Sequence, residues 1–264
     1  MNKLIGHGFI APIITSDQYI FGGAQISEEI IQDNGNWMPF LPKGEHQARL
    51  YFDTYGCTIY NTLAPIEIIE RKLFGEESEY AERPVYIGTN TAPPGNNPHV
   101  IAEWIRKNGL VPEVLLPFTD ELKNLQEYMS PKPLTTDIVW AGKDWIYKKD
   151  FGHDWVFVGG TPQEKEERLQ EALRRSPISV SVTAWKERNG IYYKEDSDID
   201  NHWTVLVAYE DDYPIIQDSY EPFIKKLEKN YSFGFAKRYT ITKKNLYKKV
   251  GFLELLKNYF NLHK

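Results

Sequence analysis

The sequence contains one cysteine, Cys57, and it stands at the start of a stretch, 57–73, that has the apolar spacing of a helix. A helix amino-terminus carries partial positive charge and unpaired backbone N–H groups, which favour a thiolate over a thiol and can donate to a developing oxyanion. Cys57 is therefore a candidate nucleophile. The alternative is a buried, inert thiol, because free cysteine is among the residue types most often buried.

A nucleophilic thiol needs a base that accepts its proton, and the base needs an acceptor that fixes its ring. His202 begins the strongly β-forming run 202–209, and Asp218 follows the next such run, 213–217. If the two runs form antiparallel strands with a turn at 210–212, Asp218 lies beside His202. Together with Cys57, this pair would supply a nucleophile, a base and an orienting carboxylate for acyl transfer; taken alone, it is also typical of a structural histidine.

The elements that must position these residues change in character along the chain. Apolar residues recur at three- or four-residue intervals over 57–73, and a second amphipathic helix is predicted over 98–108. A further helix is predicted to begin at Thr161, in the Thr-Pro-Gln-Glu sequence of a capping box, and to end before Ser176. After Pro117 the pattern otherwise favours short strands, at 137–140, 155–158, 178–182, 204–209 and 213–217. Helices first and strands later predict an α+β fold.

We predict one catalytic domain, 1–264, because no repeat, low-complexity tract or long linker interrupts the chain. Residues 1–46 alternate short apolar runs with Gly, Pro and Asn, and we expect them to form an extended N-terminal arm. We expect a mainly helical lobe over 47–130 and a mainly β lobe over 131–242. A basic, amphipathic C-terminal helix is expected over 243–264.

Charge and composition limit the partners. The net charge is −6 although 237–264 alone carries +7, so most of the chain is acidic and we expect no nucleic-acid partner. The basic tail is either a solvated surface or a site for an acidic protein partner. No apolar run approaches the roughly 20 residues of a membrane span, and no signal peptide is evident, so no membrane partner is expected. A lone cysteine fits a reducing compartment, and we expect a cytoplasmic or virion-associated protein.

The sequence implies no cofactor and no metal. Gly6-His7-Gly8 lacks the third glycine of a dinucleotide-binding turn, and no phosphate-loop lysine pattern occurs. The histidines have no second close ligand of the metal-binding type in the sequence.

Five blocks, in order along most of the chain, resemble the papain-like cysteine peptidases, in which a cysteine at a helix amino-terminus pairs with a histidine and an asparagine on later strands. The blocks are Cys57–Glu67 (C-W-A-F-S then I/L-E in the family), His99–Leu116 (helix and Asn-Gly-Leu turn), Gln170–Val182 (A-L then P-V-S-V), Gly190–Tyr192 (G-I-Y) and Asn201–Tyr209 (N-H then V-G-Y). The 145 positions from Cys57 to His202 fall within the family's range of about 130–150. The resemblance implies a two-lobed fold with the cysteine on the helical lobe and His202 and Asp218 on the antiparallel β lobe.

The resemblance also implies catalytic roles. Asp218 stands where the family has asparagine, and a carboxylate orients an imidazole equally well while stabilising imidazolium more strongly. The family's oxyanion-hole glutamine lies six residues before its cysteine, a position that Tyr51 occupies here. Gln47, ten residues before Cys57, is the expected oxyanion donor if four residues bulge out. Otherwise the hole consists of the Cys57 N–H and another donor, such as Thr54.

Substrate-binding residues are implied at Gly95, Asn201 and Tyr220. Gly95 belongs to the segment 91–98, which takes the place of the family's paired glycines without matching them. The family's disulfides are missing, and 1–46 contains no recognisable inhibitory pro-segment. Either this arm folds as part of the enzyme or control lies elsewhere.

The expected function is that of a cysteine-type endopeptidase that hydrolyses a peptide or protein substrate through a Cys-His-Asp triad and an acyl-enzyme. One alternative keeps the fold without the activity, as a binding or structural protein, for example in a viral particle. Another is a thiol acyltransferase or deamidase that uses the same three residues.

Overall fold

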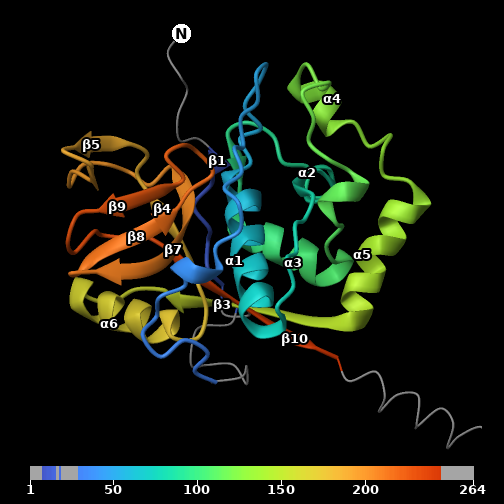
Figure 1. Ribbon diagram of the computed structural model, residues 1–264. Helices are drawn as coiled ribbons and strands as arrows, with labels where there is room; N and C mark the ends of the chain where they lie inside the picture. The colour runs from blue at the N-terminus through green and yellow to red at the C-terminus, as the bar shows by residue number, and fades with distance from the viewer. Residues whose placement is uncertain (1–7, 16–17, 19–28, 245–264) are drawn as a thin grey trace, which may run out of the picture.

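The computed structural model describes residues 8–15, 18 and 29–244, and its elements form two halves with helix α1 between them (Figure 1). Helices α2 to α5 lie on one side of α1, and a large sheet with helix α6 lies on the other. Each half has its own apolar core. This arrangement confirms the predicted α+β, two-lobed fold.

The helical half packs around α1. Its helices are α1 (Cys57–Phe74), α2 (Glu82–Gly88), α3 (Pro98–Asn108), α4 (Leu125–Met129) and α5 (Thr136–Lys148), with a 3-10 turn η2 (Glu113–Leu115). Ile59, Leu63 and Ile66 of α1 share one buried cluster with Tyr86 of α2 and Ile101 of α3. Their spacing places these α1 side chains on one helix face, as the sequence pattern predicted.

The other half is built on an eight-stranded sheet in the described part of the chain, with the order β3-β10-β4-β7-β8-β9-β6-β5. The strands are β3 (Lys149–Phe157), β4 (Ile178–Val182), β5 (Lys186–Arg188), β6 (Ile191–Tyr193), β7 (His202–Glu210), β8 (Tyr213–Gln217), β9 (Ile224–Leu227) and β10 (Ala236–Lys243). Its pairings are antiparallel except for β6 with β9. Helix α6 (Pro162–Leu173) buries Leu169 and Leu173 in the core of this half, next to Trp37, which precedes the 3-10 turn η1 (Met38–Phe40).

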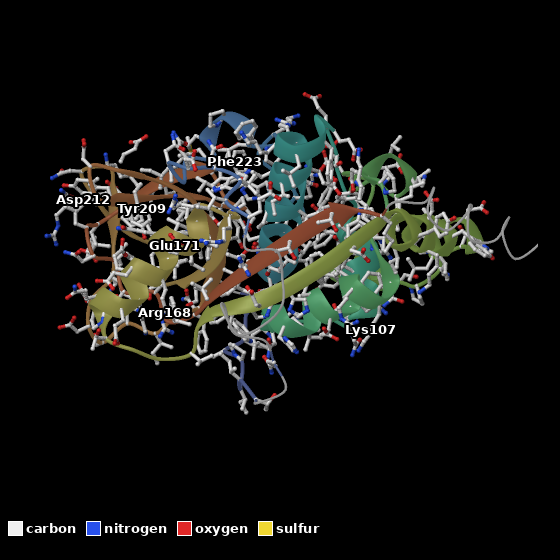
Figure 2. The ribbon with its side chains drawn as sticks, turned by 90° about the horizontal axis from the view of Figure 1, so that it is seen from below. Lys107, Arg168, Glu171, Tyr209, Asp212 and Phe223 are labelled. Carbon is white, nitrogen blue, oxygen red and sulfur yellow. The ribbon has the colours of Figure 1, made fainter. Side chains whose placement is uncertain are left out.

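Strands β3 and β10 pair along their length and run beneath both halves (Figure 2). In that view Arg168 and Glu171 mark α6 on one side, and Lys107 marks the end of α3 on the other. Arg238 of β10 forms a buried ion pair with Asp154 of β3 at 2.6 Å. Lys237 and Arg238 contribute to the positive charge of 237–264, but both are buried strand residues and are not available to an acidic partner.

Several predicted elements have the expected bounds, including the helix 98–108 and the strands 178–182 and 213–217. The capping box at Thr161 is present. The strand predicted at 137–140 is wrong, because these residues lie in α5, where Ile138 and Trp145 are buried while Val139 and Trp140 are exposed. A short apolar run does not reveal its period. Since α5 packs against α3, the helical half extends beyond residue 130.

Helix α1 continues through Pro65. A proline inside a helix removes the hydrogen bond to the carbonyl four residues earlier. Here that carbonyl, on Asn61, instead accepts from the Ser179 hydroxyl of β4 at 2.5 Å. The sheet therefore compensates for the lost helix bond and fixes the first turns of α1 against β4.

Two predictions, the C-terminal helix and the N-terminal arm, concern segments of which the structure describes only a part. The C-terminal helix predicted over 243–264 lies outside the described residues, apart from Lys243, which ends β10, and Lys244. From the arm 1–46, Gly8–Phe9 form β1, which pairs in parallel with β2 (Gly95–Asn96) close to the first turn of α1 (Figure 1). None of the helices in the described ranges has the length and apolar character needed to cross a membrane.

Candidate active site

Cys57 is the first residue of α1 and is fully buried. The helix follows Gly56, whose carbonyl accepts from the N–H groups of Ile59 and Tyr60, and no side chain caps it. Thr54 shapes the approach to the helix, because its hydroxyl oxygen accepts from the Gly56 N–H at 3.2 Å. The thiol thus lies at the positive end of α1, as predicted.

His202 and Asp218 are brought together by the hairpin of β7 and β8. Its turn contains Asp211 and Asp212, both with positive φ, and the two strands pair antiparallel. His202 Nε2 lies 2.6 Å from Asp218 Oδ1, and both side chains are fully buried. In the part of the chain that the structure describes, His202 Nδ1 is buried and has no hydrogen-bond partner. The imidazole therefore has one nitrogen held by a carboxylate and one nitrogen free to exchange a proton.

Asn61 joins the cysteine helix to the histidine strand. Its Nδ2 donates to the carbonyl oxygens of Cys57 at 3.1 Å and Trp203 at 2.6 Å, and to Ser219 Oγ at 3.2 Å. Trp203 directly follows His202, and Ser219 directly follows Asp218. One buried amide one turn after the cysteine therefore fixes all three predicted catalytic segments relative to one another.

Asp218 is surrounded by donors. Oδ1 also accepts from the Ser219 N–H at 2.8 Å, and Oδ2 accepts from Lys225 Nζ at 2.6 Å. Burial alone would raise the pKa of Asp218, but the attraction of His202 and Lys225 outweighs it and holds the pKa below its usual value. Asp218 is therefore an anion whose two oxygens are both engaged.

Gln47 lies beside this group because the chain before Cys57 forms a small hairpin. Ala48 and Asp53 form an antiparallel bridge, and residues 49–52 make the turn. This excursion contains the four residues that separate Gln47 from the family's spacing. The Ser219 hydroxyl donates to Gln47 Oε1 at 2.7 Å, and Gln47 Nε2 donates to Asp53 Oδ1 at 3.0 Å.

The three predicted substrate-binding residues have different surroundings. Gly95 forms β2, and a Cβ added there would lie 2.0 Å from the carbonyl oxygen of Gly8, so only glycine permits this close approach. The Tyr220 ring lies 5.5 Å from the His202 ring, and its hydroxyl donates to Asp53. Asn201 instead turns its Oδ1 to the Ala184 N–H at 2.9 Å, which is a loop-fixing contact.

Strand β1 covers the thiol. A Cβ added to Gly8 would lie 2.8 Å from Cys57 Sγ and 2.6 Å from the carbonyl oxygen of Tyr55. Phe9, which is 8% exposed, and the Ile10 N–H, which donates to the Asn96 carbonyl at 3.0 Å, continue the contact along β2. The described state is therefore one in which residues 8–10 occupy the space directly over the candidate nucleophile.

The covered thiol is held uncharged. Burial raises the pKa of Cys57 well above its usual value, and the hydrogen bond from the Trp203 backbone offsets this only in part. The carboxylates of Asp218 and Asp53 raise it further. The thiolate expected from the helix position is thus not the favoured form while β1 is in place.

Sequence reasoning missed two of the residues around the site. For Gly8 the sequence suggested only an incomplete nucleotide-binding turn. The signal that could have identified it is its place in the segment Gly6-His7-Gly8, where glycine allows close approach of the backbone. Lys225 was overlooked although Ile224-Lys225-Lys226-Leu227 places a lysine within a strand pattern a few residues after Asp218.

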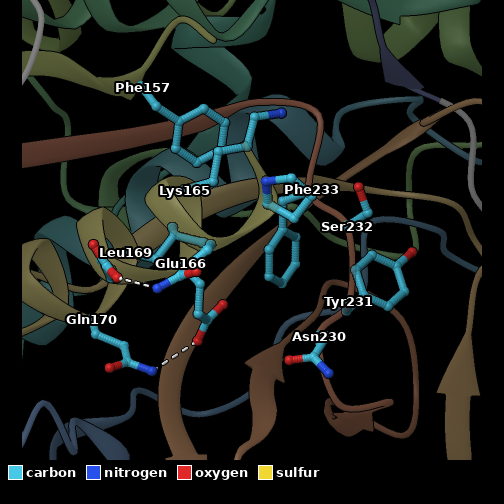
Figure 3. Close-up of a pocket in the computed structure, with 12 residues that line it drawn as sticks. Phe157, Lys165, Glu166, Leu169, Gln170, Asn230, Tyr231, Ser232 and Phe233 are labelled. Atoms are coloured by element: carbon cyan, nitrogen blue, oxygen red, sulfur yellow. Dashed lines mark hydrogen bonds between the residues drawn. The ribbon is translucent and has the colours of Figure 1, made fainter. Parts of the chain in front are cut away.

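Other parts of the described chain offer no competing centre. In the described ranges no three His, Cys, Asp or Glu side chains are grouped so as to hold a metal ion. A pocket of about 280 Å³ lies between α6 and residues 230–233 (Figure 3). Phe157, Leu169, Tyr231 and Phe233 line it, and it includes none of the predicted site residues.

No protein-family model matches the sequence. No curated protein matches it either. The structure is similar to several solved cysteine proteases. Xylellain from Xylella fastidiosa is 15% identical, with a TM-score of 0.59 over 90% of this chain and 96% of that one. The Carica candamarcensis protease CMS1MS2, solved with E-64, is 14% identical, with a TM-score of 0.55 over 78% of this chain and 96% of that one.

A third similar structure is digestive procathepsin L 3 from Tenebrio molitor, which is 17% identical, with a TM-score of 0.54 over 81% of this chain and 71% of that one. At such identities the similarity concerns the fold. The site geometry and these neighbours together lead to one conclusion: this chain has the fold of the papain-like cysteine proteases, as a divergent example of it.

Proposed function

We propose that the chain is a cysteine-type endopeptidase with Cys57 as nucleophile, His202 as general base and acid, and Asp218 as the group that orients His202. The observation that carries this proposal is the His202 ring on the strand fixed to the first turn of the Cys57 helix: Nε2 is bound to Asp218, and Nδ1 has no partner among the described residues. This arrangement supplies the three groups that acyl transfer needs.

In the proposed reaction His202 Nδ1 takes the thiol proton, and Cys57 Sγ attacks the carbonyl carbon of the scissile peptide bond. The tetrahedral intermediate collapses as the C–N bond breaks and His202 returns the proton to the leaving amine. A water molecule, deprotonated by His202, then attacks the thioester and releases the carboxylic acid product and the thiol. Asp218 keeps Nε2 occupied, so that Nδ1 remains the nitrogen that exchanges the proton.

The oxyanion hole in this proposal consists of the Cys57 N–H and the Gln47 side chain. A carboxamide nitrogen has two protons, and only one of those on Gln47 Nε2 is used by Asp53. The hydrogen bond from Ser219 to Oε1 fixes which end of the amide is the donor. The hairpin at 48–53 supports this assignment, because it brings Gln47 to the site despite its distance along the sequence.

We further propose that β1 must leave before substrate can bind. It pairs with Gly95 and Asn96, where the resemblance places the backbone of a substrate, and it lies against the sulfur. A peptide and residues 8–10 would therefore compete for the same strand edge and the same space.

The test is the rate of Cys57 alkylation by iodoacetamide as a function of pH, together with cleavage of a peptide library. Gly8→Leu in the full chain should displace β1, because a side chain there collides with Tyr55 and Cys57. Gly159→Leu is the matched control, since a Cβ at Gly159 meets no atom within 4 Å. We expect rapid alkylation of the Gly8→Leu variant below pH 6, at least about tenfold faster than in the control, and loss of this reaction when His202→Ala is added.

Other results would favour the other functions. If Cys57 of the Gly8→Leu variant reacts only as the pH nears about 8.5, whether or not His202 is present, the thiol is ordinary and the protein is a binding or structural protein. If alkylation depends on His202 but added amines are incorporated into glutamine peptides without backbone cleavage, the activity is acyl transfer or deamidation.

A further inference from the structure

Lys225 is a buried lysine in the middle of the candidate site. It lies on β9 opposite Ile216 of β8 and is 2% exposed. Its Nζ lies 2.6 Å from each of three acceptors, which are Asp218 Oδ2 and the carbonyl oxygens of Tyr220 and Pro222. An ammonium group has three protons, so all of them are used.

These contacts connect Lys225 to His202 through a single carboxylate. Asp218 gives Oδ1 to His202 and Oδ2 to Lys225. Trp185 contributes from the other side: Lys225 Nζ lies 5.0 Å from the centre of its ring, and the His202 ring lies 5.6 Å from it. Lys225 therefore lies behind the imidazole, on the same carboxylate and the same indole.

The charges of Asp218 and His202 give a physical reason for a lysine at this position. A buried carboxylate beside a histidine, without other compensation, would stabilise imidazolium so strongly that return of its proton to a leaving group is opposed. A buried pair of opposite charges has no net charge. In the papain-like proteins the residue at this position is a neutral asparagine, and Asp218 together with Lys225 restores that neutrality.

We propose that Lys225 is a positioning residue of the peptidase, which balances the charge of Asp218 so that the pair acts on His202 as a neutral carboxamide does. This inference rests on the proposed function. The other titratable groups near the pair do not take this role: burial raises the pKa of Tyr192, Tyr220 and Cys57, so these stay neutral, and the Asp53 carboxylate is bound by Tyr220 and Gln47. Burial lowers the pKa of Lys225, and the attraction of the Asp218 carboxylate opposes this shift.

The experiment replaces each member of the pair, and then both together, in the full chain that also carries Gly8→Leu. Lys225→Met, Asp218→Asn and the double variant are compared for the pH dependence of peptide hydrolysis and of Cys57 alkylation. Lys226→Met is the matched control, because Lys226 is the next residue of β9 and its amine faces Glu210 at 3.6 Å, away from the site.

We expect each single substitution to lower kcat/KM by about tenfold or more, because each leaves one buried charge without its partner. In Lys225→Met the uncompensated Asp218 should also extend cleavage to higher pH: the alkaline limb of the kcat/KM profile, where kcat/KM falls as the pH rises, should move upward by about one pH unit. The double variant should recover to within about threefold of the parent and regain its alkaline limb, since Asn with Met is neutral. Lys226→Met should leave rate and profile unchanged.

The inference is overturned if Lys225→Met lowers only thermal stability while the alkaline limb stays in place, or if the double variant is as impaired as the two single variants combined. Those outcomes leave the peptidase proposal intact, provided that the parent cleaves peptides and its alkylation depends on His202. If the parent shows neither property, the proposed function fails and the role of Lys225 falls with it.

Discussion

The ring of Phe9 stacks on that of Trp203, with centroids 5.2 Å apart and planes 5° from parallel. Trp203 is the residue after His202. Phe9 and Trp203 belong to a buried apolar cluster that also contains Cys57 and Trp155. The aromatic contact therefore anchors the arm at the point where it covers the thiol. Its loss should change the reactivity of Cys57 more than it changes the stability of the two cores.

Phe9→Ala should loosen the arm without adding any atom to it. Removing a buried phenylalanine side chain costs about 3–5 kcal/mol in a packed core, and here that cost falls mainly on the covered state. We expect Cys57 alkylation by iodoacetamide to accelerate by about tenfold or more at pH 7. Ile13→Ala is the control within the same arm, because Ile13 is 84% exposed. Equal rates for both variants would show that the contact of Phe9 with Trp203 does not control access.

The site beneath Phe9 should select aromatic substrates. When β1 leaves, it uncovers Trp203 together with Phe235, whose ring lies 5.9 Å from that of Phe9. Offset and tilted aromatic pairs of this kind stabilise a bound ring beyond its buried area. A peptide library cleaved by the Gly8→Leu variant should show Phe, Tyr or Trp enriched at one position near the scissile bond.

Phe235→Ala checks that selectivity. We expect kcat/KM for the best aromatic peptide to fall by about tenfold, with a smaller loss for the same peptide carrying alanine at that position. A uniform loss for both peptides would mean that Phe235 supports the fold and not the choice of substrate.

Gln47 should stabilise the transition state of peptide cleavage without changing the reactivity of the Cys57 thiol. Gln47→Ala removes the side-chain donor of the proposed oxyanion hole, and we expect kcat to fall by roughly 10²–10³-fold. Alkylation of Cys57 should change little, because no carbonyl oxyanion forms in that reaction. Gln163→Ala on α6 is the control, since Gln163 donates to Glu167 on the exposed surface of the same helix, away from the site. A loss of kcat no larger than that of the control would assign the oxyanion to another donor, and Thr54 is a poor one because its hydroxyl donates to the Gln47 carbonyl at 3.0 Å.

The parts of the fold that the sequence predicted well depend on local patterns. The positions of Cys57, His202 and Asp218 follow from one helix start and one hairpin, because β-forming runs separated by a short turn pair with each other. For the bulge before Cys57 the sequence supports only a conditional prediction, namely that Gln47 reaches the site if four residues bulge out. Whether 49–52 loop out depends on the hydrogen bonds of Gln47 with Ser219 and Asp53, which a local pattern does not show.

The contacts that sequence reasoning missed join distant parts of the chain. Gly8 and Cys57 are brought together by the pairing of β1 with Gly95 and Asn96, and no periodic pattern marks a two-residue strand. Lys225 looks like any lysine of a surface strand until β9 is placed beside β8. Such features arise from packing between segments that lie far apart in the sequence.

Ionisation of Glu113 should destabilise the folded protein as the pH rises through 7, and a Glu113→Gln variant isolates this contribution. Burial raises the pKa of Glu113 to about 7. A carboxyl group whose pKa is higher in the folded state stabilises it fully below its unfolded pKa of about 4.3, and this stabilisation is lost as the pH rises through about 7. Burial lowers the pKa of His153 to about 3, which has the opposite effect, but mainly between pH 3 and 6.5.

The comparison is therefore made between Glu113→Gln and the unsubstituted chain at each pH from 6.5 to 8, because the contributions of His153 and of Lys237, whose pKa burial lowers to about 7, are the same in both and cancel. Glu113→Gln keeps an acceptor for the Phe118 N–H, which the carboxylate binds at 2.8 Å, and removes the ionisation. After allowance for partial exposure, we expect the change in the free energy of unfolding from pH 6.5 to pH 8, measured by urea titration, to be about 0.5–1 kcal/mol more positive in Glu113→Gln than in the unsubstituted chain. Glu121→Gln, on the exposed surface, should show the same change as the unsubstituted chain. If Glu113→Gln shows the same change as well, Glu113 is already ionised in the folded protein at pH 6.5 and the prediction is wrong.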